Sequence, residues 1–286
     1  MSLSDQSNAI VSPAYLSAWQ EWRDELERER QDPYGFLAYS AIFVLTAEPQ
    51  RFPGVPGEWT TDSRGPRVVL SADESLTVET ETLVGGTARG EHRFAPILER
   101  EYRRAASVGD VVIELSKRGG QDLLRPIDPQ NALRAKYVGT PAFAPASEWV
   151  VEGEFVAFDT PRDRSIETVV QGMVHTYPAV GELVFEREGQ EQRLIVFSLD
   201  SEGDGAQRVK QGFTFFTDAT SGVTTYPASR TLAVALPAEG GPVTIDFNRT
   251  RNLECAYTPY SQCSLAPIEN RLSVAIEAGE MIPLIG

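Results

Sequence analysis

Polar side chains that could act as an acid, a base or an anion ligand gather in two short motifs near the C-terminus. The first motif, Asp246 to Arg249, lies at the end of residues 243–249, where apolar and polar side chains alternate. Alternation of this kind predicts a strand with one buried face. Asp246 and Asn248 would then lie together on the opposite face and supply two adjacent acceptor groups and one amide donor, with Arg249 next to them.

The second motif is Glu269-Asn270-Arg271, which precedes another alternating run. Residues 272–276 carry apolar side chains at every second position, so a strand is expected there too. Each motif therefore combines an arginine with a carboxylate at the border of a predicted strand. Arg–carboxylate pairs either stabilise a fold or belong to a site that binds an anion.

Three interpretations of these motifs stay open. In the first, a pocket binds a small polar or anionic ligand and is lined by Tyr226, Arg230, Asn248, Arg249, Asn270 and Arg271. In the second, the protein is a hydrolase that uses Asp246 or Glu269 as its general base. In the third, the protein has a structural or interaction role and the motifs are internal salt bridges. The residue types alone do not choose among them.

Two cysteines, Cys255 and Cys263, are separated by seven residues. Zinc sites use about four ligands, with two to four residues inside each ligand pair. The two histidines, His92 and His175, lie far from both cysteines along the chain. We therefore expect no metal site. The cysteines are interpreted as buried thiols, as a labile disulfide or as a nucleophilic thiolate, in that order.

Several common signatures are absent from the sequence. It contains no GxxxxGK[ST] phosphate loop, no dinucleotide-binding fingerprint and no HExxH motif. This argues against the commonest nucleotide-binding and zinc-protease classes, and we expect no cofactor.

The net charge of −15 and the pI of about 4.7 describe a strongly acidic chain. Such a charge repels nucleic-acid phosphates and anionic lipids, so neither nucleic acid nor a membrane is an expected partner. No secretory signal or apolar span of about 18 to 20 residues is visible. Together with the low cysteine content, this predicts a cytoplasmic protein.

The elements that must position these motifs are mainly short strands. One helix is expected at about residues 13–31, after the cap Ser12-Pro13 and with apolar residues at three- and four-residue steps. Later segments are short β runs with glycine turns, such as Gly119-Gly120, which predicts a tight hairpin. We predict a mainly β fold, an antiparallel β-barrel or sandwich with the N-terminal helix packed on it. Residues 1–11 would be a flexible N-terminus and residues 12–286 a single domain.

The C-terminal two thirds of the chain resemble a known family. The resemblance rests on Thr217-Asp218-Ala219-Thr220-Ser221-Gly222, Thr225-Tyr226, Arg230, Asp246-Phe247-Asn248-Arg249, Cys255-Ala256-Tyr257, Cys263, Pro267, Glu269-Asn270-Arg271-Leu272 and Ala278-Gly279-Glu280. An earlier stretch, from Lys117 to Asp128, also fits. Together they resemble the uncharacterised bacterial and archaeal family DUF1684, a domain of unknown function, although Ala266 stands where the pattern has proline. The resemblance implies a bacterial protein and no particular reaction.

Overall fold

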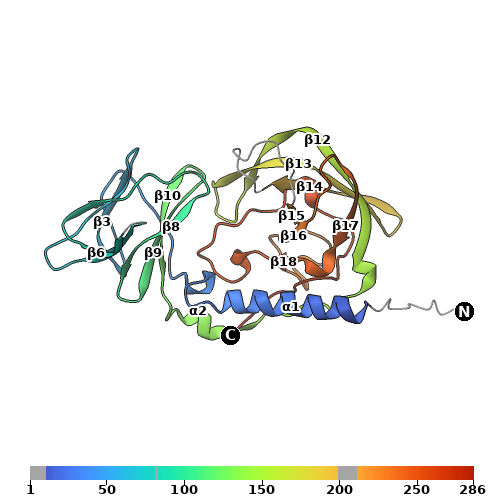
Figure 1. Cartoon of the computed structure of the whole chain (residues 1–286), viewed down its shortest axis with the longest axis horizontal. Coiled ribbons are helices and arrows are strands. Elements are labelled where there is room, and N and C mark those ends of the chain that lie inside the picture. The colour runs from blue at the N-terminus through green and yellow to red at the C-terminus, as the bar shows by residue number, and fades with distance from the viewer. Residues whose placement is uncertain (1–10, 81–82, 199–210) are drawn as a thin grey trace, which may run out of the picture. The chain divides into compact units, whose positions relative to one another are not determined.

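The computed structural model describes residues 11–80, 83–198 and 211–286. Antiparallel β-strands make up most of the regular structure, and the helix α1 (Pro13–Arg30) precedes them (Figure 1). The predicted mainly β class with an N-terminal helix is therefore confirmed. The flexible segment expected at residues 1–11 lies, apart from Val11, outside the described residues. None of the helices in the described part of the chain is long and apolar enough to span a bilayer.

The described chain divides into two compact units, and the single domain expected from the sequence stays a prediction. The first unit contains residues 11–27, 138–257 and 262–285. The second contains residues 28–137, the short segment 258–261 and Gly286. The two polar motifs near the C-terminus, at residues 246–249 and 269–271, fall in the first unit.

A seven-stranded antiparallel sheet forms the body of the first unit. Its strand order is β17-β12-β13-β14-β15-β16-β18, and it curves into a half-barrel around the C-terminal segment, drawn orange to red in Figure 1. The strands are β12 (Val150–Glu167), β13 (Val174–Arg187), β14 (Gln190–Ser198), β15 (Gly212–Phe216), β16 (Arg230–Val234), β17 (Gly241–Asp246) and β18 (Arg251–Asn252).

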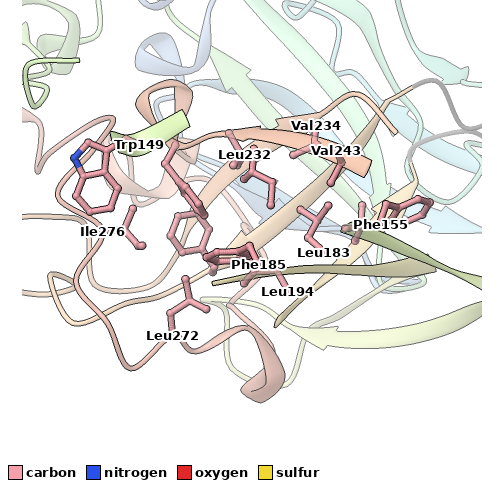
Figure 2. Close-up of a cluster of buried hydrophobic side chains, with 14 of the residues drawn as sticks. Trp149, Phe155, Leu183, Phe185, Leu194, Leu232, Val234, Val243, Leu272 and Ile276 are labelled. Atoms are coloured by element: carbon pink, nitrogen blue, oxygen red, sulfur yellow. The ribbon is translucent and has the colours of Figure 1, made fainter. Parts of the chain in front are cut away.

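The concave face of the half-barrel carries the main core of this unit. Side chains from β12 to β17 pack there with residues of the C-terminal segment. Figure 2 shows Leu272 and Ile276 in the same cluster as Trp149 and Phe185. A second apolar cluster, which includes Phe197, uses alternate positions of the strands. Both faces of the central strands are therefore buried, and this explains their nearly continuous apolar runs.

Residues 272–276 do not form the strand that their alternation predicts. Their apolar side chains point into the core as expected, but their backbone has no neighbouring strand. Leu272 N donates to Thr217 O at 2.8 Å, and Ala219 N donates to Val274 O at 3.1 Å. Buried backbone groups must find partners, and here they find them in the loop after β15. Residues 271–280 are thus an irregular segment inside the half-barrel, which we call the strap.

The second unit is a sandwich of two antiparallel sheets that share one apolar cluster, which includes Trp59, Ile113 and Leu124. The larger sheet contains β1 (Phe43–Val44), β5 (Leu76–Thr80), β6 (Leu83–Ala88), β8 (Tyr102–Val108), β9 (Val111–Arg118) and β10 (Gln121–Ile127). The smaller contains β2 (Gln50–Phe52), β3 (Val55–Asp62), β4 (Gly65–Val69) and β7 (Glu91–Arg93). The predicted hairpin is confirmed, since Gly119 and Gly120 join β9 to β10 with positive φ angles of 57° and 76°.

The remaining elements are short. They are η1 (Phe36–Ala38), α2 (Ala132–Lys136), β11 (Tyr137–Gly139), η2 (Ser147–Trp149), η3 (Phe247–Arg249), η4 (Glu254–Ala256), η5 (Ile268–Asn270) and β19 (Leu284–Ile285). Three of these 3-10 turns, η3 to η5, lie in the motifs that the sequence singled out. Short turns of this kind aim side chains in directions that a strand would not allow.

Candidate functional site

The first motif lies at the end of β17 and not within a strand. The strand ends at Asp246, and the following three residues form η3. Asp246 caps this turn, because its Oδ1 accepts from the backbone N–H of Asn248 at 3.2 Å. The expectation that Asp246 and Asn248 share one strand face is therefore wrong. The two side chains meet through the turn instead, with Asn248 Nδ2 donating to Asp246 Oδ1 at 3.2 Å.

Asp246 also connects β17 to helix α1. The hydroxyl of Tyr15 donates to the Asp246 carboxylate, with both oxygens at 2.8 Å. Burial and the negative charge of Asp246 raise the pKa of Tyr15, so this hydroxyl stays protonated. Arg249 Nε lies 3.3 Å from Asp246 Oδ2, and the guanidinium lies 5.4 Å from the centre of the Trp22 ring. The carboxylate therefore already has three side-chain partners.

Asn248 is buried and holds the chain that enters β12. Its side chain forms a reciprocal pair with the backbone of Ala146: Oδ1 accepts from N–H at 3.1 Å, and Nδ2 donates to C=O at 3.0 Å. Its own carbonyl accepts from Trp19 Nε1 at 2.9 Å. The carboxamide thus joins two loops through the same pair of hydrogen bonds that two β-strands would exchange.

Asn270 also uses its carboxamide to bind backbone groups, in this case those of strands β14 and β15. It is fully buried, and its Oδ1 accepts from the backbone N–H of Ile195 at 2.7 Å. Its Nδ2 lies within hydrogen-bond distance of Ile195 O, Phe215 O and Thr214 Oγ1, at 3.1, 2.9 and 2.9 Å. These atoms belong to β14 and β15, beyond the point where the two strands pair directly. Asn270 therefore fills a gap in the sheet.

The neighbours of Asn270 point to the surface. Glu269 forms an exposed ion pair with Arg164 of β12, and Arg271 is exposed as well. A backbone hydrogen bond and the nearby Arg164 guanidinium lower the pKa of Glu269. The three residues of this motif are therefore not one site, because the middle side chain enters the core while its neighbours face solvent.

Arg230 of β16 is fully buried, and its guanidinium binds the strap. Nη2 donates to Asp218 Oδ2 at 2.8 Å and to Ile276 O at 2.9 Å. Nη1 donates to Ala278 O at 2.6 Å and to Glu280 O at 3.2 Å. Burial lowers the pKa of Arg230, while Asp218 and Glu280 oppose this shift. The planar, forked guanidinium suits this arrangement of several acceptors.

Asp218 was not among the residues predicted for a site. It lies in the loop after β15, and its Oδ1 accepts from Thr220 N–H at 2.8 Å, Thr220 Oγ1 at 2.6 Å and Ile276 N–H at 3.2 Å. An Asp followed two residues later by Thr is an ordinary turn signal. No local pattern indicates that the same carboxylate also neutralises a buried arginine.

Glu280 is a second buried carboxylate that sequence reasoning missed. Its Oε1 pairs with Arg23 of helix α1. Its Oε2 accepts from the backbone N–H of Asn252 at 2.8 Å and from the hydroxyl of Tyr257 at 3.2 Å. The preceding residue is Gly279, with φ +72°, where a Cβ would lie 2.4 Å from a backbone oxygen of Thr250. Close approach and positive φ therefore both require glycine there.

We call this set the polar framework: Arg23, Asp218, Arg230, Asn248, Asn270 and Glu280. All six side chains are buried, and each bonds to backbone or side chains of the first unit. Their common effect is to fix loops and the strap to the half-barrel, since buried polar groups are stable only when they have partners.

A different arrangement surrounds the two cysteines. Cys255 and Cys263 are half-buried thiols, and the backbone N–H of Cys255 donates to Cys263 Sγ at 3.2 Å. The hydroxyl of Tyr226 donates to the Cys255 carbonyl at 2.9 Å. Hydrogen bonding from Cys263, followed by Tyr226, lowers the pKa of Cys255 against the opposing effect of burial. Among the described residues, no group of three or more His, Cys, Asp or Glu side chains could hold a metal ion.

Fold and side chains together define an antiparallel half-barrel protein with an internal polar framework. The chain belongs to the family described as "Protein of unknown function (DUF1684)", whose model matches residues 135–281. The match confirms the resemblance of the C-terminal portion, and the stretch from Lys117 to Asp128 lies outside it.

A solved structure among those similar to the chain matches part of it. It is the solution NMR structure of an uncharacterized protein from gene locus rrnAC0354 of Haloarcula marismortui, with 26% sequence identity and a TM-score of 0.43. The similarity covers 52% of this chain and 78% of that one. No curated protein is significantly similar to the chain.

Proposed function

We propose that this protein has a structural or interaction role and that its C-terminal motifs serve as internal braces, not as a reaction centre. The observation that carries the proposal is the position of Arg230. Its side chain is fully buried; Nη2 donates to Asp218 and to one carbonyl of the strap, and Nη1 donates to two further carbonyls. An arginine that received a ligand would need donors directed at solvent or at a cavity.

The two asparagines support the same interpretation. Asn248 and Asn270 use both ends of their carboxamides on backbone groups of Ala146 and Ile195. A carboxamide that is satisfied in this way gains nothing from a polar ligand, because the ligand would first have to displace internal hydrogen bonds. These contacts favour a structural role.

The carboxylates predicted as general bases are poorly suited to that task. The pKa of Glu269 is lowered, and a carboxylate with a low pKa is a weak base at neutral pH. Asp246 already accepts hydrogen bonds from Tyr15 and Asn248 and pairs with Arg249. A general base needs an accessible oxygen within reach of the proton that it removes.

A second candidate function, binding of a small anion, is favoured by one observation. The side chains of Asp246 and Arg249 retain exposed fractions of 22% and 35%. Arg249 also lies over Trp22, which would give a planar ligand an apolar surface. An anion at this place would compete with Asp246 for the guanidinium.

The substitution Asp246→Asn separates these functions. If Asp246 is a brace, the variant loses about 1–2 kcal/mol of unfolding free energy, because the charge-assisted bonds to Tyr15 and Arg249 weaken. Thermal unfolding of both proteins would show the loss. A hydrolase screen with many ester, amide and phosphoester substrates should give equal rates for wild type and variant, with Glu269→Gln as the matched control.

A substrate that the wild type turns over and that Asp246→Asn or Glu269→Gln does not would overturn the proposal. For the second candidate, the melting temperature is measured with phosphate and with small carboxylic acids. A ligand-induced rise in the wild type that disappears in Arg249→Ala would establish anion binding. Equal behaviour of both proteins would leave the structural role.

The proposal includes a cytoplasmic location without nucleic-acid or membrane partners. The net charge of −15 supports the second part, because an acidic surface repels polyanions. A chain of 286 residues with only two cysteines agrees with a reducing compartment.

A further inference from the structure

The cysteine pair is not part of the polar framework. Cys255 follows β18 within η4, and Cys263 follows eight positions later, where its carbonyl accepts from Val169 N–H at 3.0 Å. Both residues are half-buried, so a small reagent has partial access to them. This distinguishes them from the fully buried side chains of the framework, whose chemistry is internal.

The intervening loop is fixed by packing. Tyr257, Thr258, Ser261 and Gln262 are buried. Residues 258–261 are counted with the second unit, and Tyr260 packs there against the cluster around Tyr39. The hydrogen bond from Cys255 N to Cys263 Sγ joins the two ends of this nine-residue segment.

A hydrogen bond at the ends of the loop brings the Cys263 sulfur to the backbone of Cys255. The distance of 3.2 Å between Cys255 N and Cys263 Sγ places that sulfur within about 4.7 Å of the Cys255 Cα, given an N–Cα bond of about 1.46 Å. The hydroxyl of Tyr226 donates to the carbonyl oxygen of Cys255 at 2.9 Å. The Cys263 sulfur and the Tyr226 hydroxyl therefore both lie against the backbone of Cys255.

We propose that Cys255 and Cys263 form a reversible dithiol–disulfide site, in which Cys255 is the attacking thiol and Tyr226 is a positioning residue. The oxidant is a low-molecular-weight disulfide, R–S–S–R. Its chemical class follows from the half-buried position, which admits a small reagent more readily than a protein partner.

The reaction has two balanced steps. The Cys255 thiolate attacks one sulfur of R–S–S–R, which breaks the S–S bond, forms a Cys255–S–S–R mixed disulfide and releases one thiolate. The Cys263 thiolate then attacks Cys255 Sγ, forms the intramolecular disulfide and releases the second thiolate. The two protons lost by the cysteines are taken up by the two released thiolates. Reduction by a thiol reverses both steps.

The electrostatics of the site support the first step. The pKa of Cys255 is lowered, chiefly by the hydrogen bond from Cys263 and next, against burial, by that from Tyr226. A thiolate is the nucleophile in thiol–disulfide exchange, so a lowered pKa increases the reactive fraction near neutral pH. Burial and the adjacent thiolates raise the pKa of Tyr226, which therefore remains a donor.

The direct experiment uses the full-length protein in buffers with increasing ratios of oxidised to reduced glutathione. After alkylation of the remaining thiols, trypsin releases both cysteines in one peptide, Asn252–Arg271, because Arg251 precedes it and no other Lys or Arg lies inside. We expect this peptide to lose two hydrogen atoms and to escape alkylation under oxidising conditions. Cleavage after Tyr257 or Tyr260 should then leave its two parts joined.

The melting temperature and the rate of Cys255 alkylation are measured alongside the glutathione experiment. Oxidation should raise the melting temperature of the wild type by roughly 5–10 °C, because it closes a nine-residue loop in the unfolded chain. Cys263→Ala should stop at the mixed disulfide on Cys255 and show no such rise. Tyr226→Phe should slow alkylation of Cys255 at neutral pH roughly three- to tenfold and move its pH profile upward.

A peptide that keeps two alkylatable thiols in fully oxidised glutathione would overturn the proposal. So would accumulation of glutathione on both cysteines without an internal disulfide. An unchanged pH profile in Tyr226→Phe would remove the role of Tyr226. These readouts depend on the wild-type thiols, so they stay informative whatever becomes of the proposed role of the framework.

Discussion

Two arginine–carboxylate pairs of the first unit differ in almost everything except their chemistry. Arg230 and Asp218 are both fully buried, with Nη2 and Oδ2 at 2.8 Å. Arg164 and Glu269 form a pair whose side chains have exposed fractions of 40% and 42%. The buried pair is surrounded by further acceptors and donors of the strap, whereas the exposed pair joins η5 to β12 at the surface.

The difference shows how burial determines what an ion pair contributes. Exposed pairs contribute little, because water screens the charges and the side chains lose entropy when they are held together. A buried pair costs desolvation when it forms, and removal of one partner leaves the other charge without compensation. Similar residue types in one family segment can therefore be essential or nearly neutral for stability.

The largest expected effect comes from Arg230→Ala, with Arg164→Ala as the matched control. The first variant should lose about 3–5 kcal/mol of unfolding free energy, since it leaves Asp218 buried without its counter-charge. The control should stay within about 1 kcal/mol of the wild type. Urea denaturation measures both, and Asp218→Asn gives a milder test of the same pair. Similar losses in both arginine variants would contradict the comparison.

A smaller loss is expected for Asn270→Ala, compared with Arg271→Ala at the next position. Truncation of Asn270 removes its bonds to Ile195 and Phe215 and should cost on the order of 3 kcal/mol. Arg271 is exposed, so its truncation should change stability by less than about 0.5 kcal/mol. Thermal unfolding of the two variants side by side provides the measurement. Equal costs at the two positions would mean that the gap between β14 and β15 closes without the carboxamide.

The smallest effect is expected for Glu269→Gln and depends on pH. The folded protein holds the pKa of Glu269 below its ordinary value, so its contribution is present above that ordinary value of about 4.3. The contribution disappears as the pH falls through the lower, folded-state pKa. Because the pair is exposed, the difference from wild type at neutral pH should be at most about 0.5 kcal/mol. A difference that grows on acidification would have the wrong sign.

Part of the fold could be predicted from local patterns. The helix predicted for residues 13–31 is α1, Pro13–Arg30, because a cap and a clear apolar periodicity are both local signals. The hairpin at Gly119-Gly120 was predictable for the same reason. The strap was predicted only in part: the alternation of residues 272–276 identified the inward side chains but not the absence of a neighbouring strand.

The candidate site shows the same division. The sequence located the motifs, and the structure pairs Arg249 of the first motif with Asp246. The sequence did not reveal that Arg230 would meet Asp218 and the strap, or that Glu280 would pair with Arg23, 257 residues away. Contacts at such separations are produced by the tertiary fold, and no local pattern encodes them.

By itself, the sequence determined the β-rich class, the N-terminal helix, the acidic charge and the family, since these follow from composition, periodicity and local motifs. The tertiary structure alone decided which polar side chains are buried and which face solvent. The physical reason is that a charge or carboxamide has no fixed role of its own. Its contribution depends on the partners and the water around it, and the fold brings those together from distant parts of the chain.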